Sequence, residues 1–240
     1  MRNLRSFAIL DYVRARKVCS IRELMEHFRV SQATIHRDVA ELAQTGALRR
    51  VRGAVAYPEN VPQEKNAHTA LLSFRERMNW NRSKKLTIAR RALERVCEGD
   101  ILFLDSSTTV SYLADLLADS NFSNLTIVTN AVSVIQNFHR FPPHYVRISL
   151  GGSYDLQLHA FLGQAAIREL EHLSISKAFV SAFGLCDDSI TTNHENHAVL
   201  LRHVLDMAAE KYLLLDRSKY KRSGLFKIGQ RRMFDGVISD

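Results

Sequence analysis

Apolar residues in the first 58 positions recur at the spacing of three short helices. The stripe from Leu4 to Val13 predicts a first helix, because its apolar side chains return every three residues. Ser20 and Glu23 have the spacing of a capping box and predict that a second helix begins there. A third helix is predicted after Ser31, a second N-cap residue, and it ends near Gly46.

The second and third predicted helices are separated by a tight turn, which is the arrangement of a helix-turn-helix. In that motif the second helix, here the third predicted helix from Ser31 to Ala43, turns its N-terminal end toward the major groove of DNA. The next segment, LRRVRGAVAY, alternates basic with apolar residues and predicts a β-hairpin wing whose arginines reach phosphates. The residues predicted to contact DNA are Ser31, Gln32, Ala33, Thr34, His36, Arg37, Arg49, Arg50 and Arg52.

A trihelical protein-interaction module with a solvated basic face is the alternative interpretation of this segment. The distribution of charge favours DNA instead. The formal net charge is +8, and residues 1–58 hold 11 Lys and Arg against 5 Asp and Glu, whereas the remaining residues hold 22 against 20. A basic excess confined to the first quarter of the chain, together with the basic wing, indicates a nucleic-acid partner.

Residues 58–68, PENVPQEKNAH, contain two prolines and mostly polar side chains, so we place a domain boundary there. The predicted organisation is a winged helix-turn-helix over 1–58, a linker over 59–73 and an α/β domain over 74–240. The basic segment over residues 73–96 is interpreted as a solvated helix face, with an extension of the DNA footprint as the alternative.

From Gly99 onward short apolar runs alternate with helical patterns. The runs ILFL, LTIV, YVRISL, KAFVSAF and YLLL predict buried strands. Helices are predicted around residues 109–118, 131–139, 162–172 and 194–210. This alternation predicts an α/β sheet with mainly parallel strands.

Polar residues and glycines follow each of the five predicted strands, where ligands of such sheets bind. The groups in question are residues 105–109, 129–130, 151–152, 184 and 216–219. Hydroxyls and free amides at a strand-to-helix turn form an anion site, and Lys219 can add a full charge. Asp105 and Glu195 can accept hydrogen bonds from sugar hydroxyls, so we predict a phosphorylated polyol or sugar as ligand.

The composition excludes several other classes of protein. No apolar run approaches the ~20 residues that a membrane helix needs, and charges interrupt the N-terminal apolar segment, which argues against a signal peptide. Cys19, Cys97 and Cys186 are isolated, so they are expected to be free thiols and not a disulfide or zinc framework. We expect a cytoplasmic protein without a cofactor.

The run SIRELMEHFRVSQATIHRDVAELAQTGALRRVRGA resembles the winged helix-turn-helix of the DeoR-type bacterial transcriptional regulators. GDILFLDSSTT, LTIVTNA, FLGQAA, KAFVSAFGL and LLLDRSKY resemble the effector domain of the same family, a Rossmann-like fold related to ribose-phosphate isomerase. The resemblance departs at His36 and at Arg52-Gly53-Ala54, and at Ser107, where the family carries glycine. It implies a sugar phosphate as inducer and places Asp105, Ser107, Thr108, Thr109, Asn130, Gly152, Glu195 and Lys219 at the effector site.

An aldose-ketose phosphate isomerase is the alternative from another class, because the same strand-end groups could serve proton transfer. The N-terminal helix-turn-helix argues against it, since an isomerase does not need one. His194, Glu195 and His197 lie within one helical turn and are compatible with a metal, but we expect them to be solvated or hydrogen-bonded. We predict a homo-oligomeric repressor of a carbohydrate-metabolism operon, dimeric or tetrameric, that binds operator DNA and is relieved by a phosphorylated sugar.

Overall fold

The computed structural model describes residues 8–10, 12–13, 16, 18–44, 48–51, 53–57 and 74–240. The chain forms two compact units, Met1–Lys65 and Asn66–Asp240, and each is described by itself. The division lies inside the predicted linker 59–73, which is outside the described residues, as are Leu4, Phe7, Gly46 and Arg52. The domain boundaries therefore stay a prediction.

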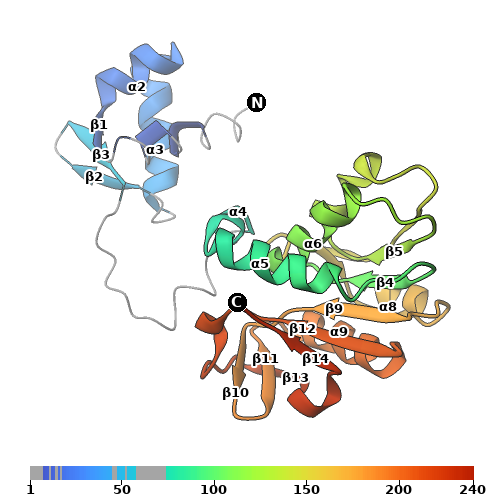
Figure 1. Cartoon of the computed structure of the whole chain (residues 1–240). Coiled ribbons are helices and arrows are strands. Elements are labelled where there is room, and N and C mark those ends of the chain that lie inside the picture. The colour runs from blue at the N-terminus through green and yellow to red at the C-terminus, as the bar shows by residue number, and fades with distance from the viewer. Residues whose placement is uncertain are drawn as a thin grey trace. The chain divides into compact units, whose positions relative to one another are not determined.

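In the described part of the first unit, residues 8–10 and 12–13 of the predicted first helix are helical, and two further helices and a small antiparallel sheet follow (Figure 1). The side chain of Ser20 accepts a hydrogen bond from the amide of Glu23 at 3.1 Å, which confirms the predicted N-cap of the first of these two further helices. The strands lie in the order β1-β3-β2. The elements are β1 Val18–Ser20, α2 Ile21–Phe28, α3 Gln32–Gln44, β2 Arg49–Val51 and β3 Ala54–Ala56.

A parallel six-stranded sheet is the centre of the second unit (Figure 1). Its order is β14-β12-β9-β4-β5-β6, so the chain runs outward from β4 on one side and from β9 on the other. All five predicted strands are present, but β6 is an edge strand and largely exposed, so its predicted burial was wrong, and β14 at the opposite edge was not predicted. The strands are β4 Ile101–Leu104, β5 Thr126–Thr129, β6 Val146–Ser149, β9 Lys177–Val180, β12 Glu210–Leu214 and β14 Gly236–Ile238.

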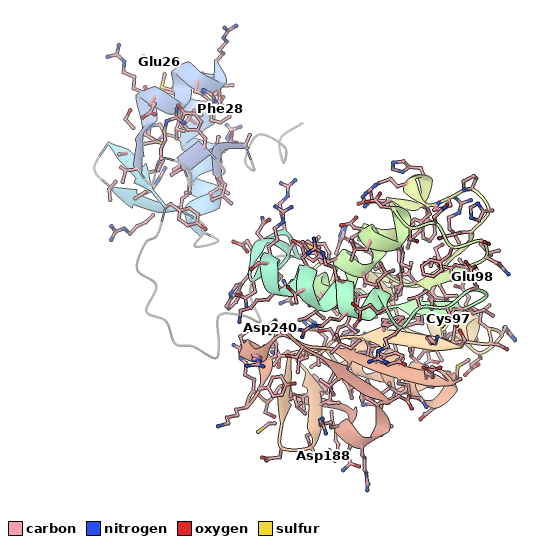
Figure 2. All side chains as sticks on the ribbon, in the orientation of Figure 1. Glu26, Phe28, Cys97, Glu98, Asp188 and Asp240 are labelled. Carbon is pink, nitrogen blue, oxygen red and sulfur yellow. The ribbon has the colours of Figure 1, made fainter. Side chains whose placement is uncertain are left out.

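Helices cover both faces of this sheet, and side chains fill the layers between (Figure 2). Successive side chains of a strand point to opposite faces. Leu102 and Leu104 accordingly pack in the cluster that includes α5 and α6, whereas Phe103 packs in the cluster that includes α8 and α9. The helices are α4 Phe74–Asn79, α5 Arg82–Leu93, α6 Thr108–Ala118, α7 Val132–Ile135, α8 Gln164–Leu170 and α9 Glu195–Met207.

Two small antiparallel sheets lie beside the main one and were not predicted. β7 Ser153–Asp155 and β8 Ala160–Leu162 form a hairpin. β10 Gly184–Cys186, β11 Ser189–Thr192 and β13 Phe226–Gln230 form the other sheet. The predicted helix 131–139 is shorter than expected, since α7 ends at Ile135 and a 3-10 turn follows at Phe138–Arg140.

A buried ion pair closes the edge of the sheet where the parallel strands begin. Nζ of Lys177, the first residue of β9, lies 2.9 Å from Oδ2 of Asp100, just before β4. The same ammonium donates to the carbonyl of Arg95 at 2.9 Å. Cys97 and Glu98, labelled in Figure 2, belong to this edge of the molecule.

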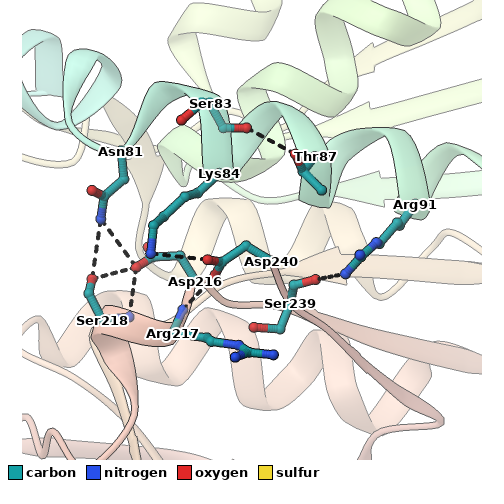
Figure 3. A network of polar contacts seen from close by, with 10 residues as sticks. All are labelled: Asn81, Ser83, Lys84, Thr87, Arg91, Asp216, Arg217, Ser218, Ser239 and Asp240. Carbon is teal, nitrogen blue, oxygen red and sulfur yellow. Dashed lines mark hydrogen bonds and ion pairs between the residues drawn. The ribbon is translucent and has the colours of Figure 1, made fainter.

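A polar network fastens α5 to the loop after β12 and to the last residues of the chain (Figure 3). The side-chain amide of Asn81 donates to Asp216 at 3.3 Å and to Ser218 at 3.4 Å. Nζ of Lys84 lies 3.0 Å from a carboxylate oxygen of Asp240, and Arg91 donates to the carbonyl of Ser239. The start of α5 is therefore fixed over the carboxyl ends of the parallel strands.

Candidate functional site

Helix α3 begins directly after Ser31, the N-cap residue that the sequence predicted. The carbonyl of Ser31 accepts from the amides of Thr34 and Ile35 at 3.0 and 3.1 Å, and the Ser31 and Thr34 hydroxyls lie 2.9 Å apart. The segment therefore enters the helix at the predicted position, directly after the turn that follows α2.

The N-terminal half of α3 has one buried face and one exposed face. Ile35 and Val39 are buried in the core of the first unit. The exposed residues of this half are Gln32, Ala33, His36 and Arg37, whereas Thr34 is partly buried. This is the exposed face that the helix-turn-helix interpretation requires for base contacts.

The wing is tied to α3 by an arginine. Arg50 of β2 donates to the backbone carbonyl of His36 at 3.3 Å. Arg49 is exposed on the same strand, and Gly53 in the turn has φ +75°, a conformation that favours glycine. Arg52 lies outside the described residues. α3 and the wing therefore present their exposed groups as one surface.

A pocket opens in the second unit at the point where the order of the strands reverses, between the carboxyl ends of β4 and β9. Asp105 bridges this point, because its carboxylate accepts from the amides of Ser107 and Ser181, each at 2.8 Å. The loops after β4, β9 and β12 line the pocket, as ligand sites of such sheets do. The lining residues are Arg77, Trp80, Asn81, Lys85, Ser106, Ser107, Thr108, Thr109, Gln157, Leu158, Ser181, Ala182, Phe183, Thr192, Asn193, His194, His197, Asp216, Ser218, Lys219 and Arg222.

The N-terminus of α6 forms one wall of this pocket. Ser107 is its N-cap, and the Ser107 hydroxyl accepts from the amide of Val110 at 3.2 Å. Its φ is −74°, so the backbone at this position does not require glycine. Thr108 and Thr109 follow in the first turn, where the helix amides have no partner within the helix. The serine in place of glycine therefore acts as a helix cap and leaves this turn open to the pocket.

Four cationic side chains also line the pocket, namely Arg77, Lys85, Lys219 and Arg222. Burial and, to a smaller extent, the charge of Lys219 lower the pKa of Lys85 to about 8. Burial likewise lowers the pKa of Lys219 to about 8, although Asp216 acts in the opposite direction. Among the described residues, neither lysine forms a salt bridge; Lys85 donates to the carbonyl of Arg77 and Lys219 to that of Ala182. An anion in the pocket would stabilise both charges.

The eight predicted effector residues divide into two groups. Ser107, Thr108, Thr109 and Lys219 line the pocket, but the other four do not. Burial raises the pKa of Asp105 to about 6, and its two backbone contacts hold the loops after β4 and β9 in place. We therefore assign Asp105 a supporting role in the pocket wall.

Asn130, Gly152 and Glu195 also lie away from the pocket lining. Asn130 donates to the carbonyl of Phe161 at 3.1 Å, and a Cβ at Gly152 would lie 2.4 Å from the carbonyl oxygen of Leu162. Both residues thus support the β7–β8 hairpin, which covers the ends of β5 and β6. Glu195 is exposed at the start of α9. The expectation that five strand ends meet in one crevice was too broad, because β5 and β6 lie beyond β4 from the point of reversal.

Several lining residues were not predicted as effector residues, and His197 was considered only as a possible metal ligand. Lys85 lies three and four residues before Ile88 and Ala89 and shares their buried face of α5. His197 lies in the same relation to Leu200 and Leu201 of α9. A polar residue on an apolar stripe was the available signal in both cases. The interpretation of residues 73–96 as a wholly solvated face was therefore wrong at Lys85, which is 5% exposed.

Arg77 had no comparable signal. It lies on α4, a short helix with no buried residue, and it reaches across to donate to the carbonyl of Gln157 at 2.7 Å. Gln157 belongs to the loop between β7 and β8, neither of which was predicted. Only the folded chain brings these two segments together at the pocket.

A metal site and a membrane span were also considered. In the part of the chain that the structure describes, which includes residues 194–197, no group of His, Cys, Asp or Glu is arranged to hold a metal ion. The same residues contain no helix with the length and hydropathy to cross a membrane.

Comparisons with known proteins agree with both units. Residues 5–61 match the DeoR-like helix-turn-helix domain, and residues 80–240 match the DeoR C terminal sensor domain. The chain is 30% identical to the lactose phosphotransferase system repressor of Streptococcus mutans, over 97% of this chain and 89% of that protein. It is 29% identical to the L-fucose operon activator of Haemophilus influenzae, over 99% and 92% respectively.

Among solved structures, ribose 5 phosphate isomerase A from Neisseria gonorrhoeae is distantly similar. The match has 15% sequence identity and a TM-score of 0.42, and covers 57% of this chain and 53% of the isomerase. The sequence left a regulator and an isomerase as alternatives, and the two domain matches show that the chain is a regulator. The predicted family is confirmed, and the chain belongs to the DeoR family of transcriptional regulators.

Proposed function

We propose that the protein is a cytoplasmic repressor of a carbohydrate-metabolism operon, released from its operator when a phosphorylated sugar occupies the pocket of the second unit. The observation that supports the effector class is the cationic pocket at the N-terminus of α6. The names of the relatives, a lactose phosphotransferase system repressor and an L-fucose operon activator, support a sugar operon. Because one of them is an activator, the sign of regulation requires an experiment.

The chemistry of the pocket favours a phosphate group over a neutral ligand. Lys85 and Lys219 are held in positions that disfavour their charged forms, as their lowered pKa values indicate. A phosphate dianion would reverse this penalty and could accept hydrogen bonds from Thr108 and Thr109 at the favourable end of the α6 dipole.

DNA recognition is assigned to the exposed face of α3 and to the wing. We assign Arg37 to a base edge and Arg49 to a phosphate, because both side chains are exposed on these elements. One helix in one groove reads few bases, so we propose a homo-oligomer that binds paired half-sites ~34 Å apart. The effector releases DNA by favouring an arrangement of the oligomer that fits the operator less well.

Gel-shift titrations on the DNA upstream of the protein's own gene test DNA binding. We expect Arg37→Ala to weaken specific binding by about 1–3 kcal/mol, and Arg49→Ala to reduce the salt slope of log affinity by about one. Arg168→Ala, an exposed arginine of α8 in the second unit, is the control and should bind like the wild type.

The effector is tested by adding sugar phosphates to the preformed complex. Release by a sugar phosphate but not by the unphosphorylated sugar is expected, and a reporter fused to the same promoter gives the sign of regulation. The proposal is wrong if neither arginine variant changes binding, or if sugars release the DNA equally well with and without phosphate.

A further inference from the structure

Two buried polar atoms of the pocket have no hydrogen-bond partner among the described residues. They are Oγ of Ser106 and Nε2 of His197. Ser106 is 1% exposed and His197 is 6% exposed, and both residues line the pocket. Burying a polar group without a hydrogen-bond partner lowers the stability of the fold. Two such groups at one pocket therefore indicate a ligand that forms hydrogen bonds with them.

His197 is fixed in place by the first turn of α9 and by one neighbour. Its Nδ1 lies 3.5 Å from the hydroxyl of Thr192, which leaves Nε2 as the free nitrogen of the ring. Burial, with smaller contributions from the nearby His194 and Arg77, lowers the pKa of His197 to about 3. The imidazole is therefore uncharged at physiological pH.

Different charged groups act on His197 and on Lys219, and Arg77 is common to both sets. The charged groups that act on His197 are His194, Arg77 and Asp155. Those that act on Lys219 are Asp216, Arg222 and Arg77. We call the part of the pocket at Lys219 its cationic end; it suits the phosphate, whereas the part at His197 offers an uncharged ring nitrogen.

The chemistry of a neutral imidazole selects the kind of group that can lie against it. Depending on its tautomer, Nε2 either donates or accepts one hydrogen bond, and the Ser106 hydroxyl can do both. A hydroxyl group pairs with either tautomer. An anionic oxygen pairs only with the donor form, and an ammonium group only with the acceptor form.

We propose that His197 and Ser106 form a second, uncharged subsite that binds hydroxyl groups of the sugar or polyol part of the ligand and so determines which phosphorylated sugar is accepted. This inference rests on the proposed function, because it assumes that the phosphate occupies the end at Lys219. His197 is then a specificity-determining residue, and inorganic phosphate needs only the cationic end.

The test compares two classes of probe on the full-length protein by isothermal titration. Inorganic phosphate carries the anion alone, and ribose 5-phosphate, glucose 6-phosphate, fructose 6-phosphate and glycerol 3-phosphate carry hydroxyls as well. We expect at least one sugar phosphate to bind about tenfold or more tightly than inorganic phosphate. His197→Leu should remove this advantage and change the affinity for inorganic phosphate by less than about twofold.

Two further variants separate a direct contact from a general disturbance of α9. His197→Gln keeps a group that can donate and accept near the position of Nε2, and should restore part of the advantage. His203→Leu alters another histidine of the same helix, whose Nδ1 contacts the carbonyl of Val199 at 2.9 Å, and should behave like the wild type. Circular dichroism melts verify that each variant is folded.

The possible results distinguish the two proposals. Equal losses for both classes of probe in His197→Leu, or an unchanged preference for the sugar phosphate, overturn the subsite. If no sugar phosphate exceeds inorganic phosphate in the wild type, the subsite is also overturned, while phosphate binding that is lost in Lys219→Met still supports the anion site. If no probe binds at all, the proposed effector class fails as well.

Discussion

Buried or half-buried lysines lie at both ends of the parallel strands of the central sheet, and their surroundings differ. At the end where the parallel strands begin, Lys177 is paired with Asp100 at 2.9 Å. Burial lowers the pKa of Lys177, but the hydrogen bond and charge of Asp100 more than offset this, so its pKa is raised. At the other end the pKa values of Lys85 and Lys219 are lowered to about 8, and neither lysine has a carboxylate within salt-bridge distance among the described residues.

The comparison distinguishes one lysine that stabilises the fold from two lysines that we expect to bind a ligand. Lys177 has its counterion inside the chain, so its charge is satisfied at all times. Lys85 and Lys219 face a pocket beside Arg77 and Arg222, and Asp216 offsets their lowered pKa only in part, so we expect a bound anion to supply the rest of their counterion. Removing the charge should therefore have opposite consequences at the two ends.

The largest effect is expected for Lys177→Met. It leaves the buried carboxylate of Asp100 without a partner, and should lower the free energy of unfolding by about 3–5 kcal/mol. Urea unfolding of the full-length protein measures this. The double variant Lys177→Met with Asp100→Asn should recover part of the loss. A single variant as stable as the wild type would contradict a structural role for the pair.

Lys219→Met should have a smaller and different effect. Loss of a charged hydrogen bond to the ligand costs about 1.5–3 kcal/mol of binding, which is a factor of about 10 to 150 in the affinity for a phosphate ester. The melting temperature of the ligand-free protein should stay the same or rise, because a disfavoured charge is removed. Lys221→Met, an exposed neighbour, is the control. A lower melting temperature with unchanged affinity would reverse the assignment.

The pH dependence of binding sharpens the same comparison. Both pocket lysines have a pKa of about 8 in the ligand-free protein, against about 10.4 in an unfolded chain. Affinity for a phosphate ester should be nearly constant up to about pH 7 and then fall as pH rises through about 8, where the lysines lose their protons. Titration calorimetry up to about pH 9.5 measures this, and Lys219→Met should show a shallower fall. An affinity independent of pH would mean that the lysines do not contact the anion.

The sign of the accompanying change in stability follows from the same shift. Between about pH 8 and 10 the unfolded chain binds more protons at these lysines than the folded chain does, so their contribution to the free energy of unfolding rises with pH. Lys177, whose pKa is raised, contributes stability below its unfolded pKa and loses it as pH rises through the folded value. Chemical unfolding of Lys219→Met and wild type across this window isolates the first contribution.

The smallest effect is expected at Asn81, which links the start of α5 to the loop that carries Lys219. Its side chain contacts Asp216 and Ser218, and its backbone is left-handed with φ +54°. Asn81→Gly keeps this conformation and loses the contacts, so it should cost about 0.5–1.5 kcal/mol of stability. Asn81→Ala should cost about 1 kcal/mol more, because alanine disfavours this backbone. Equal melting temperatures for the two variants would contradict the backbone argument.

Periodicity was sufficient to predict the elements that are buried on both faces or along one stripe. Strands such as ILFL are uniformly apolar, and the helices between them carry regular stripes, so their order and type follow from local pattern alone. The strands of β7, β8 and β10 are three residues long, and their pattern is too short to distinguish from a turn.

The candidate site was predicted only in part, because its geometry depends on the order of the strands. The sequence shows that polar residues follow every strand, but it does not show which strand ends are neighbours in the sheet. Ser107 to Thr109 and Lys219 fall beside the reversal between β4 and β9, whereas Asn130 and Gly152 fall on the far side of β4. Arg77 and Lys85 come from helices that precede the first strand of the sheet, so no strand-end rule could have included them.

The position of Arg77 has a practical consequence for exchanging sensor domains between regulators. The recognised sensor domain begins at residue 80, yet Arg77 lines the pocket and holds the loop at Gln157 from the preceding helix α4. A chimera joined at residue 80 would combine this pocket with the other regulator's residue at position 77. Its response to the native inducer would then reflect the donor of the DNA-binding half. A junction ahead of Phe74 transfers the pocket as a whole.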